Sequence, residues 1–600
     1  MFEKKWSFAV VDRAVRDRLA TELNVSPILA GLLLNRGVST ADEAARFLSP
    51  RLADLHDPFL LPDMEPAVER IVRAVRNGEP IAICGDYDVD GLSSTALFVE
   101  FFRRVGTEVQ TYIPNRIEDG YGLNATAVNR LADASIRLII TVDNGSSAGE
   151  EIELASARGV DVVVSDHHPP SDPLPRPLAL VNPHHPASRY PFPHLAGVGV
   201  AYKLIWAISQ NFSRSRKLSP EFREFMLEGL ALVALGTISD VVPLHGENRV
   251  LAKFGLAALA ESRRPGIRRL VERALRGEEE ALRAEHVAFR IGPAINAVGR
   301  LGQAESGLRL LTTGSSVEAD TLIADLESAN RRRQEIERGI TATVRDRVLA
   351  EVDLSRARAI VLADAGWHPG VVGIAAARAV DEFHRPTILI ALNGKTGRGS
   401  ARSIPGVNIC EALGRCRQHL IGYGGHAYAA GVEIAADSVE GLRHSLQEAI
   451  LSAPAEMLKV LDIEAEVSLN DLNQPLLSEL ERLEPHGAGN RAPLLATREL
   501  KVAGEPRPMG QDGRHLTFYV RGLAPSAGEG STGHPASRPA YRAVAFGRGE
   551  SYRRLLATGR PIDLAFRPRL NRWGGNERIE LNVEEVRFCS PAPDSDSRSN

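Results

Sequence analysis

Cysteine is scarce in this 600-residue chain, and the few cysteines are widely scattered. The four of them, Cys84, Cys410, Cys416 and Cys589, include no CxxC pair. We therefore expect neither a zinc knuckle nor a disulfide framework. Unpaired cysteines also favour a reducing compartment, so the expected location is the cytoplasm.

Long hydrophobic runs are missing as well. No stretch of about 18 apolar residues occurs, so the sequence predicts no membrane-spanning helix and no membrane partner. The N-terminal stretch MFEKKWSFAVVDRAVRDRL carries charges throughout and lacks the apolar centre of a signal peptide.

The chain also has no overall excess of positive charge. Its net charge is -4, which does not identify a nucleic-acid-binding protein. The local balance differs: between Tyr541 and Arg572 there are eight arginines and only two acidic residues, Glu550 and Asp563. Such a cluster fits either an ordinary solvated surface or a surface that follows a phosphate backbone.

Changes of pattern along the chain indicate several domains, because 600 residues exceed one ordinary core. From 80 to 182, short runs rich in Ile and Val alternate with helical stretches, which is typical of a mostly parallel sheet covered by helices. A second α/β pattern begins at 357, and short strands dominate from about 460, which favours a small barrel. The predicted segments are a helical segment 1–75, an α/β domain 76–315, a connecting helix 316–353, a smaller α/β domain 354–455, a β-barrel 456–588 with a low-complexity loop 524–540, and a disordered tail 589–600.

Acidic residues and histidines gather where elements of the first α/β domain end. Such ends meet at one edge of a parallel sheet, where ligands bind. The residues concerned are Asp86, Asp88 and Asp90 in GDYDVDG, Asp143 in LIITVDNGSS, Asp166, His167 and His168 in VVVSDHHPP, and Asp240 in ALGTISDVVPL.

If these ends converge, several carboxylates and at least one imidazole share a small volume. So many anions require neutralising protons or cations. Carboxylates with one histidine suit Mn²⁺ or Mg²⁺, whereas zinc prefers more His or Cys ligands. Two such ions about 3.5–4 Å apart are the usual arrangement for phosphoryl hydrolysis.

Each of these signals also has an ordinary structural explanation. An aspartate between a strand and a helix is commonly a helix N-cap, which applies to Asp86, Asp88 and Asp143. Asp90-Gly91 is a common turn pair. The two histidines of the DHH triplet precede a Pro-Pro pair and could simply belong to a loop. The sequence alone leaves these alternatives open for each residue taken singly.

The order of the motifs resembles a known family, the DHH phosphoesterases, which take their name from the triplet at 166–168. Within that family the chain looks like the bacterial exonucleases that are specific for single-stranded DNA. The resemblance runs from 33 to 493 and rests on GDYDVDGLSSTA, TVDNGSS, SDHHPP, LAGVGVAYKL, GTISDVVPL and RIGPAINAVGRL.

The resemblance implies roles for the clustered residues. Asp143 would bridge two divalent ions, Asp88 would bind one of them, and the other would be bound by Asp90, His167 and Asp240. His168 would face the scissile phosphate, and Asp166 would orient a histidine. Small DHH phosphatases carry a histidine at the position of Cys84, so Asp86 or water is expected to complete that ligand set.

The second half of the chain resembles the rest of such an enzyme. GRGSARSIPG and YGGHAYAAG look like a DHHA1 substrate domain, and a Gly-rich strand edge would let backbone N–H groups approach a phosphate. The last region looks like an OB-fold, with candidate stacking residues Phe518, Tyr519, Tyr541, Phe546 and Trp573. The implied substrate contacts are Asn296, Arg300, Ser400, Arg402, Gly425 and His426.

The function implied by the resemblance is a metal-dependent 5′→3′ exonuclease that cuts single-stranded DNA into mononucleotides during DNA repair and recombination. A monomer is expected, with single-stranded DNA as partner and a helicase and a single-strand-binding protein as cooperating proteins. Two alternatives remain: a DHH phosphodiesterase acting on short oligonucleotides or cyclic dinucleotides, and a catalytically inactive DNA-binding scaffold. The barrel disfavours the first, and the complete set of acidic residues disfavours the second.

Overall fold

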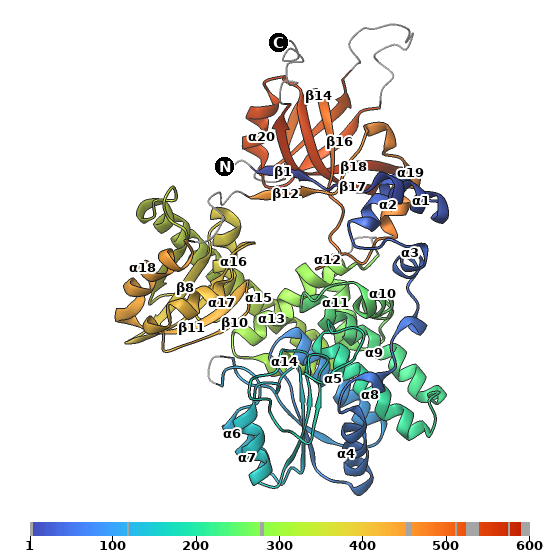
Figure 1. Cartoon of the computed structure of the whole chain (residues 1–600), viewed down its shortest axis with the longest axis vertical. Coiled ribbons are helices and arrows are strands. Elements are labelled where there is room, and N and C mark those ends of the chain that lie inside the picture. The colour runs from blue at the N-terminus through green and yellow to red at the C-terminus, as the bar shows by residue number, and fades with distance from the viewer. Residues whose placement is uncertain are drawn as a thin grey trace. The chain divides into compact units, whose positions relative to one another are not determined.

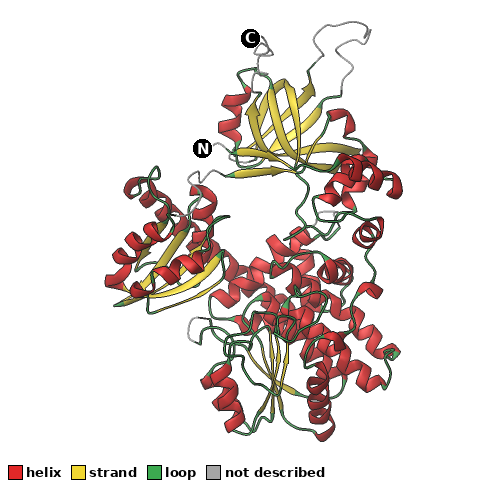
Figure 2. Cartoon of the chain, viewed as in Figure 1, coloured by secondary structure: helices red, strands yellow, loops and turns green. Residues whose placement is uncertain are grey.

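The chain forms two compact units, which are described separately (Figure 2). The larger is Leu52–Lys459, and the smaller combines Met1–Arg51 with Val460–Asn600. Most of the low-complexity loop and all but the first residue of the predicted tail lie outside the described residues. The computed structural model describes residues 4–116, 119–276, 281–451, 459–510, 513–523, 539–573 and 576–589.

A five-stranded parallel sheet forms the centre of the first α/β domain, with strand order β3-β2-β4-β5-β6 (Figure 1). The chain passes from β2 outward to β3 and then returns to β4 on the other side of β2. The winding therefore reverses between β2 and β4, and such a reversal opens a crevice at the carboxyl ends of the two strands. The strands are β2 (Ile81–Cys84), β3 (Val109–Tyr112), β4 (Leu138–Val142), β5 (Asp161–Ser165) and β6 (Ala179–Val181).

Helices cover both faces of this sheet, as the alternating pattern predicted (Figure 1). Ala82 and Cys84 of β2 pack with α6 and α7, whereas Ile81 and Ile83 pack with α4, α5 and α8. Successive strand residues point to opposite faces, so both faces of β2 are apolar. The helices are α4 (Met64–Asn77), α5 (Val89–Arg104), α6 (Ala125–Asp133), α7 (Gly149–Ala157) and α8 (Gly197–Ser213).

A helical layer follows the sheet in the chain and positions Asp240. This residue is the C-cap of α9, which packs tightly on α10. A Cβ atom on Gly255 of α10 would lie 2.4 Å from the carbonyl oxygen of Leu230 in α9. The helices are α9 (Pro220–Ser239), α10 (Gly246–Ala260), α11 (Pro265–Leu275), α12 (Ala284–His286), α13 (Gly292–Arg300) and α14 (Ala304–Thr312).

One long helix, α15 (Ser316–Glu351), joins the two α/β domains of the larger unit. Its 36 residues span about 54 Å. Leu322 and Leu326 near its start belong to the core of the first domain, whereas Val344 and Val348 near its end belong to a core of the second. Because α15 is packed into both cores, it acts as a strut between them.

The second α/β domain has a mixed sheet with strand order β10-β11-β9-β8-β7, parallel only between β7 and β8. The Gly-rich stretch at 397–402 was expected at a strand edge, but it forms β9 inside this sheet, and the edge strand is β10. Gly397 and Gly399 are needed there because a Cβ atom on either would lie within 3 Å of Ile390. The elements are β7 (Ile360–Asp364), β8 (Thr387–Asn393), β9 (Thr396–Arg402), β10 (Gly422–Gly425), β11 (Ala429–Ala435), α16 (Val372–Phe383), α17 (Ile409–Arg415) and α18 (Val439–Ala449).

The smaller unit contains the predicted ring of strands. Its sheet runs β13-β14-β15-β16-β18-β17, and β14 also pairs with β17, which closes the ring. Two helices, α19 (Gln474–Glu481) and α20 (Gly549–Leu556), accompany it. The strands are β12 (Val460–Ile463), β13 (Ala465–Glu466), β14 (Leu495–Met509), β15 (His515–Gly522), β16 (Tyr541–Ala545), β17 (Ile562–Trp573) and β18 (Asn576–Phe588).

The predicted helical segment 1–75 is divided between the two units. Its start is a strand, β1 (Lys5–Phe8), which pairs in parallel with β12. Local pattern could not reveal this pairing because the partner strand lies far away in the chain. Helix α4 belongs instead to the larger unit. The helices that share the smaller unit are α1 (Arg13–Leu23), α2 (Pro27–Leu34) and α3 (Ala41–Leu48).

Within the described part of the chain, no helix combines the length and the apolar content needed to cross a bilayer.

Two glycine-to-alanine substitutions inside helices should have opposite effects on stability. Gly255→Ala places a Cβ atom against the backbone of α9 and should lower the free energy of unfolding by about 1–3 kcal/mol. Gly339→Ala in α15 meets nothing within 4 Å and should raise it by up to about 1 kcal/mol through helix propensity. Urea unfolding of both variants measures the difference, and equal effects would contradict the packing of α9 on α10.

Candidate active site

The acidic residues predicted from strand ends do converge, at the crevice between β2 and β4. Side chains from the loop after β2, the ends of β4 and β5 and the end of α9 lie together there. In each of three groups, the candidate ligand atoms all lie within 4.8 Å of one another. The groups are Asp86, Asp88 and Asp143; Asp90, His167 and Asp240; and Asp143, Asp166, His167 and His168.

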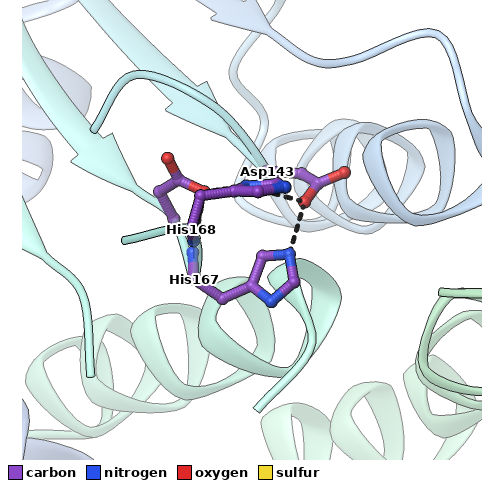
Figure 3. A group of neighbouring side chains, drawn as sticks. Asp143, His167 and His168 are labelled. Carbon is purple, nitrogen blue, oxygen red and sulfur yellow. Dashed lines mark hydrogen bonds and ion pairs between the residues drawn. The ribbon is translucent and has the colours of Figure 1, made fainter. Parts of the chain in front are cut away.

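Asp143 lies at the centre of this cluster (Figure 3). Its Oδ1 is 3.2 Å from Nε2 of His167 and 3.9 Å from Nδ1 of His168. The backbone of Asp143 is left-handed, with φ of 62°, and the residue is buried. A Cβ atom on Gly197 would lie 2.5 Å from the same carboxylate oxygen, so the first turn of α8 must carry glycine for Asp143 to fit.

Asp88 and Asp90 have different partners at the start of α5. Asp88 is the N-cap, and its Oδ1 accepts hydrogen bonds from the backbone N–H groups of Asp90 and Gly91. The capping explanation is therefore correct for Asp88, although the same carboxylate also lies in a group with Asp86 and Asp143. Asp90 accepts the N–H groups of Gly197 at 2.7 Å and Val198 at 2.9 Å. Those two bonds tie the carboxylate to the N-terminus of α8.

His167 points its Nε2 atom at carboxylates from two elements. Nε2 lies 3.7 Å from Oδ2 of Asp240, in addition to its contact with Asp143. A hydrogen bond to the backbone of Leu195 holds the imidazole ring from another side. Burial, followed by the neighbouring His168, lowers the pKa of His167 to about 4. The ring is therefore neutral at physiological pH, which is the form that binds metal.

The crowded carboxylates resist ionisation. Burial is the largest cause and raises the pKa of Asp86, Asp143 and Asp240 well above the usual value, and neighbouring carboxylates add to this effect. Burial and the charge of Asp88 raise the pKa of Asp90 to about 7. A site that ionises only with difficulty needs nearby positive charge near neutral pH.

Unpartnered atoms of this cluster show which charge it would accept. Oδ1 of Asp86, Oδ1 of Asp143 and Nε2 of His167 are buried and lack a hydrogen-bond partner among the described residues. Buried polar atoms without partners are rare in folded proteins and call for an explanation. Two oxygens and one imidazole nitrogen are suitable ligands for Mn²⁺ or Mg²⁺, so the residues present fit divalent cations.

Asp166 favours the protonated form of His168, whereas His167 is neutral. Nδ1 of His168 lies 2.8 Å from Oδ1 of Asp166, whose oxygens also accept the N–H groups of Ser146, His167 and His168. Burial is the largest single influence on His168 and opposes its protonation, but the bond to Asp166 together with the charges of Asp166, Asp90 and Asp88 outweighs it, so the pKa of the imidazole is raised. Burial also acts against ionisation of Asp166, yet the histidines hold its pKa at about 2. Asp166 therefore favours the protonated, donating form of the partly exposed His168 beside the cluster.

Three arginines, Arg116, Arg300 and Arg402, converge next to the loop after β2 that carries Asp86, Tyr87 and Asp88. Burial, then the charges of Arg116 and Arg402, lower the pKa of Arg300 to about 10. Arg116, which the sequence analysis missed, lies 4.9 Å above the ring of Tyr87, between Asp86 and Asp88 in the chain. It follows β3, whose carboxyl end opens at the same sheet edge, and this position was the available signal. Clustered guanidinium groups suit phosphate oxygens.

The other predicted substrate residues fall into three places. Asn296 accepts the N–H of Val89 through its side-chain oxygen at 3.1 Å and so holds the start of α5. Arg402 donates to Oγ of Ser400 at 2.7 Å. A Cβ atom on Gly373, in the first turn of α16, would lie 2.9 Å from that oxygen, so a helix N-terminus adjoins the pair.

Gly425 and His426 are not brought to the arginines. They lie at the end of β10, two strands from Arg402, because β11 pairs with both β9 and β10. This corresponds to about 10 Å between the strand axes. Both residues are exposed. They can contact a longer substrate beyond the cluster, but the structure does not group them with it.

The aromatic residues proposed for stacking separate clearly in the smaller unit. Phe518 lies in the core at 2% exposure, which excludes it as a stacking surface. Tyr541 is half-buried and donates to the carbonyl oxygen of Leu472. Tyr519 and Phe546 are 45% and 55% exposed and remain available. The side chain of Trp573 lies outside the described residues.

Three stretches of the chain match known families. Residues 80–237 match the DHH family, N-terminal domain, residues 356–452 match the DHHA1 domain, and residues 463–585 match the RecJ OB domain. These stretches follow one another in the order of the two α/β domains and the ring of strands.

Whole-chain relatives decide the family. The chain is 34% identical to the single-stranded-DNA-specific exonuclease RecJ of Bacillus subtilis, over 97% of this chain and 70% of that protein. It is 35% identical to the RecJ of Dickeya dadantii, over 95% of this chain and 98% of that protein. The chain belongs to the RecJ family. The expected resemblance to DHH exonucleases is thereby confirmed, together with the OB domain.

Solved RecJ structures share the fold. RecJ of Thermus thermophilus in complex with Mn²⁺ has a TM-score of 0.80 and 31% identity, and the match covers 98% of this chain and 80% of that one. The same protein in complex with Mg²⁺ has a TM-score of 0.75. These RecJ structures confirm the predicted α/β architecture with its connecting helix.

Charge removal from the cluster should stabilise the protein in the presence of a chelator. The raised pKa values mean that the folded state binds protons more tightly than the unfolded state, so stability should fall from about pH 5 to about pH 8. The depressed pKa of Asp166 acts only below this window, and the lowered pKa of the single His167 opposes the four carboxylates only in the lower part of the window. Asp143→Asn removes one repelling charge. It should therefore raise the melting temperature measured in the presence of chelator, and most strongly at about pH 8.

Thermal melts over this range, with chelator or with Mn²⁺, check the expectation. Mn²⁺ should raise the melting temperature of the natural protein more at about pH 8 than at about pH 5. Asp437→Asn, in the second α/β domain, is the control and should change neither curve. A chelated Asp143→Asn variant that melts below the natural protein at the higher pH would refute the charge-crowding account.

Proposed function

We propose that this chain is a metal-dependent exonuclease that acts on single-stranded DNA from the 5′ end and releases mononucleotides, in DNA repair and recombination. The proposal rests chiefly on two buried atoms that have no hydrogen-bond partner among the described residues, Oδ1 of Asp143 and Nε2 of His167. They lie between the carboxylates of Asp86 and Asp88 and those of Asp90 and Asp240. Membership of the RecJ family supports the proposal, since relatives over the whole length are single-stranded-DNA-specific exonucleases.

Two divalent ions, Mn²⁺ or Mg²⁺, would occupy the cluster. When bound, they supply Lewis acidity that activates water and offsets charge on the phosphate. Asp143 shares one group with Asp86 and Asp88, and its Oδ1 lies 3.2 Å from Nε2 of His167, which shares another group with Asp90 and Asp240, so Asp143 could contribute a ligand to both places. One ion would be held by Asp86, Asp88 and Asp143, and the other by Asp90, Asp143, His167 and Asp240.

His168 would act on the scissile phosphate, and Asp166 would hold His168 in place. Asp166 orients the imidazole and favours its protonated form through its bond to Nδ1. The protonated ring would donate to a phosphate oxygen or to the leaving oxygen, where negative charge grows in the transition state. Preorganised donors of this kind need no rearrangement during the reaction.

The arginine cluster would bind the phosphates of the strand. Arg116, Arg300 and Arg402, with Ser400, present donors beside the N-terminus of α16, which favours anions. Asn296 would hold the start of α5, just after Asp88, in place. Gly425 and His426 would contact the DNA strand further out. This cluster lies beside the candidate metal ligands, as binding of a terminal phosphate next to the cut requires.

The wider assignments rest on the same likeness. Proposed boundaries are those of the predicted domains, because each family match falls inside one of them. We further propose that the protein is a cytoplasmic monomer that works with a helicase, which exposes single strands, and with a single-strand-binding protein. The domains are a DHH domain 76–315, a connecting helix 316–353, a DHHA1 domain 354–455 and an OB domain 456–588.

Asp143→Ala should abolish cleavage and leave strand binding intact. Loss of a shared ligand should reduce the rate by a factor of about a thousand or more, because the charge on the phosphate is no longer offset. Digestion of strands labelled at the 5′ or the 3′ end, with and without chelator, measures rate, direction and product length together. Fluorescence anisotropy measures binding.

The control for this variant is Asp437→Ala, which should cleave normally. Undiminished Mn²⁺-dependent cleavage by Asp143→Ala would refute the metal assignment. Faster turnover of a dinucleotide than of a long strand would favour the short-substrate phosphodiesterase, and binding without any cleavage by the natural protein would favour the inactive scaffold.

Arg402→Gln should weaken recognition of the strand end. Loss of a charge-assisted contact should raise KM for a 5′-phosphorylated strand by about tenfold, with a smaller effect on a strand that ends in a 5′-hydroxyl. Steady-state digestion of the two strands gives the comparison. Arg443→Gln, on α18, is the control, and an equal loss on both strands would contradict a terminal-phosphate role.

A further inference from the structure

The hydroxyl of Tyr121 joins two residues of the candidate active site. It donates to the backbone carbonyl oxygen of Asp143 at 2.9 Å, and its oxygen lies 3.1 Å from Nδ1 of His168. The rings of Tyr121 and His168 meet edge to face, with 5.7 Å between their centroids. Tyr121 therefore contacts both Asp143 and His168.

Two left-handed glycines place Tyr121 at this point. Gly120 and Gly122 have φ of 86° and 69°, a conformation that favours glycine. A Cβ atom on Gly122 would lie 3.2 Å from the Cβ of Asn144, so the turn packs closely against the chain that follows β4. Asn144 in turn donates to the carbonyl oxygens of Cys84 and Val142. The tyrosine is thus braced against the ends of β2 and β4.

The hydrogen-bond inventory fixes which partner donates. A phenol has one proton, and Tyr121 gives it to the carbonyl oxygen of Asp143. Toward His168 its oxygen can then only accept, so the Nδ1 proton is shared between that oxygen and the carboxylate of Asp166 at 2.8 Å. Nδ1 has acceptors on two sides, and rotation of the ring would break both contacts.

We propose that Tyr121 is a positioning residue for His168. This inference rests on the proposed function. Through its hydroxyl, Tyr121 fixes the imidazole plane so that the opposite ring atom, Nε2, is directed at the scissile phosphate. It anchors that hydroxyl on the carbonyl of Asp143, whose left-handed backbone turns the carbonyl toward it. Histidine and central carboxylate are thereby held in register.

A rival role for the same residue is contact with the DNA strand, because the side chain is 44% exposed. The two roles predict different kinetics. Loss of a residue that positions His168 weakens stabilisation of the transition state and lowers kcat. Loss of a residue that binds the strand equally in the ground state and the transition state raises KM.

The test is Tyr121→Phe, which keeps the ring and removes only the hydroxyl. We expect kcat on a 5′-phosphorylated single strand to fall about tenfold, with KM within about twofold of the natural value. The melting temperature should not change. Tyr202→Phe is the matched control: its hydroxyl donates to the carbonyl oxygen of Met226 in the helical layer, and its loss should leave kcat unchanged.

A double-mutant cycle identifies the residue through which Tyr121 acts. If it acts through His168, Tyr121→Phe should change the single-turnover rate of His168→Asn by less than about twofold. A full tenfold effect in that background, a raised KM with normal kcat, or an unchanged kcat in Tyr121→Phe would each overturn the proposal. The natural protein in the same assay separates the two levels, because absence of single-strand cleavage there refutes the proposed function itself.

Discussion

The mutual repulsion of carboxylates at one buried point is the constraint on which this structure depends. Asp86, Asp90, Asp143 and Asp240 all have raised pKa values because the fold buries them together. Backbone elements are shaped around them: a Cβ atom on Gly236 would lie 2.5 Å from Oδ1 of Asp90. A fold that brings these carboxylates so close together needs compensating positive charge, which divalent ions would provide.

Neighbouring histidines show how the fold assigns different tasks to identical side chains. His167 is buried among carboxylates and is kept neutral, whereas Asp166 raises the pKa of His168 and favours its protonated form. Environments that separate the pKa values of adjacent groups commonly mark an acid and a ligand or base. Here the neutral ring can bind metal, and the charged ring can serve the phosphate. Because both residues are histidines, the difference between the two roles comes only from what surrounds each ring.

The phosphate-binding side of the site is assembled across two domains. Arg300 ends α13 of the first domain and donates to the carbonyl oxygen of Gly370, before α16 of the second. A Cβ atom on Gly370 would lie 2.4 Å from the carbonyl oxygen of Arg300, so the two backbones touch directly. With α15 packed into both cores, this contact fixes the spacing between the carboxylate cluster and Arg402.

Most of the elements and most of the cluster could be predicted from the amino-acid sequence. Apolar runs that end in Asp143 or in Asp166 and His167 place their carboxylates at one sheet edge, because parallel strands direct their carboxyl ends the same way. Only the tertiary structure revealed Arg116 and Tyr121, since the loop after β3 has no periodicity to show where its side chains point. The interior position of β9 and the pairing of β1 with β12 were likewise decided by contacts between segments distant in the chain, which local pattern does not encode.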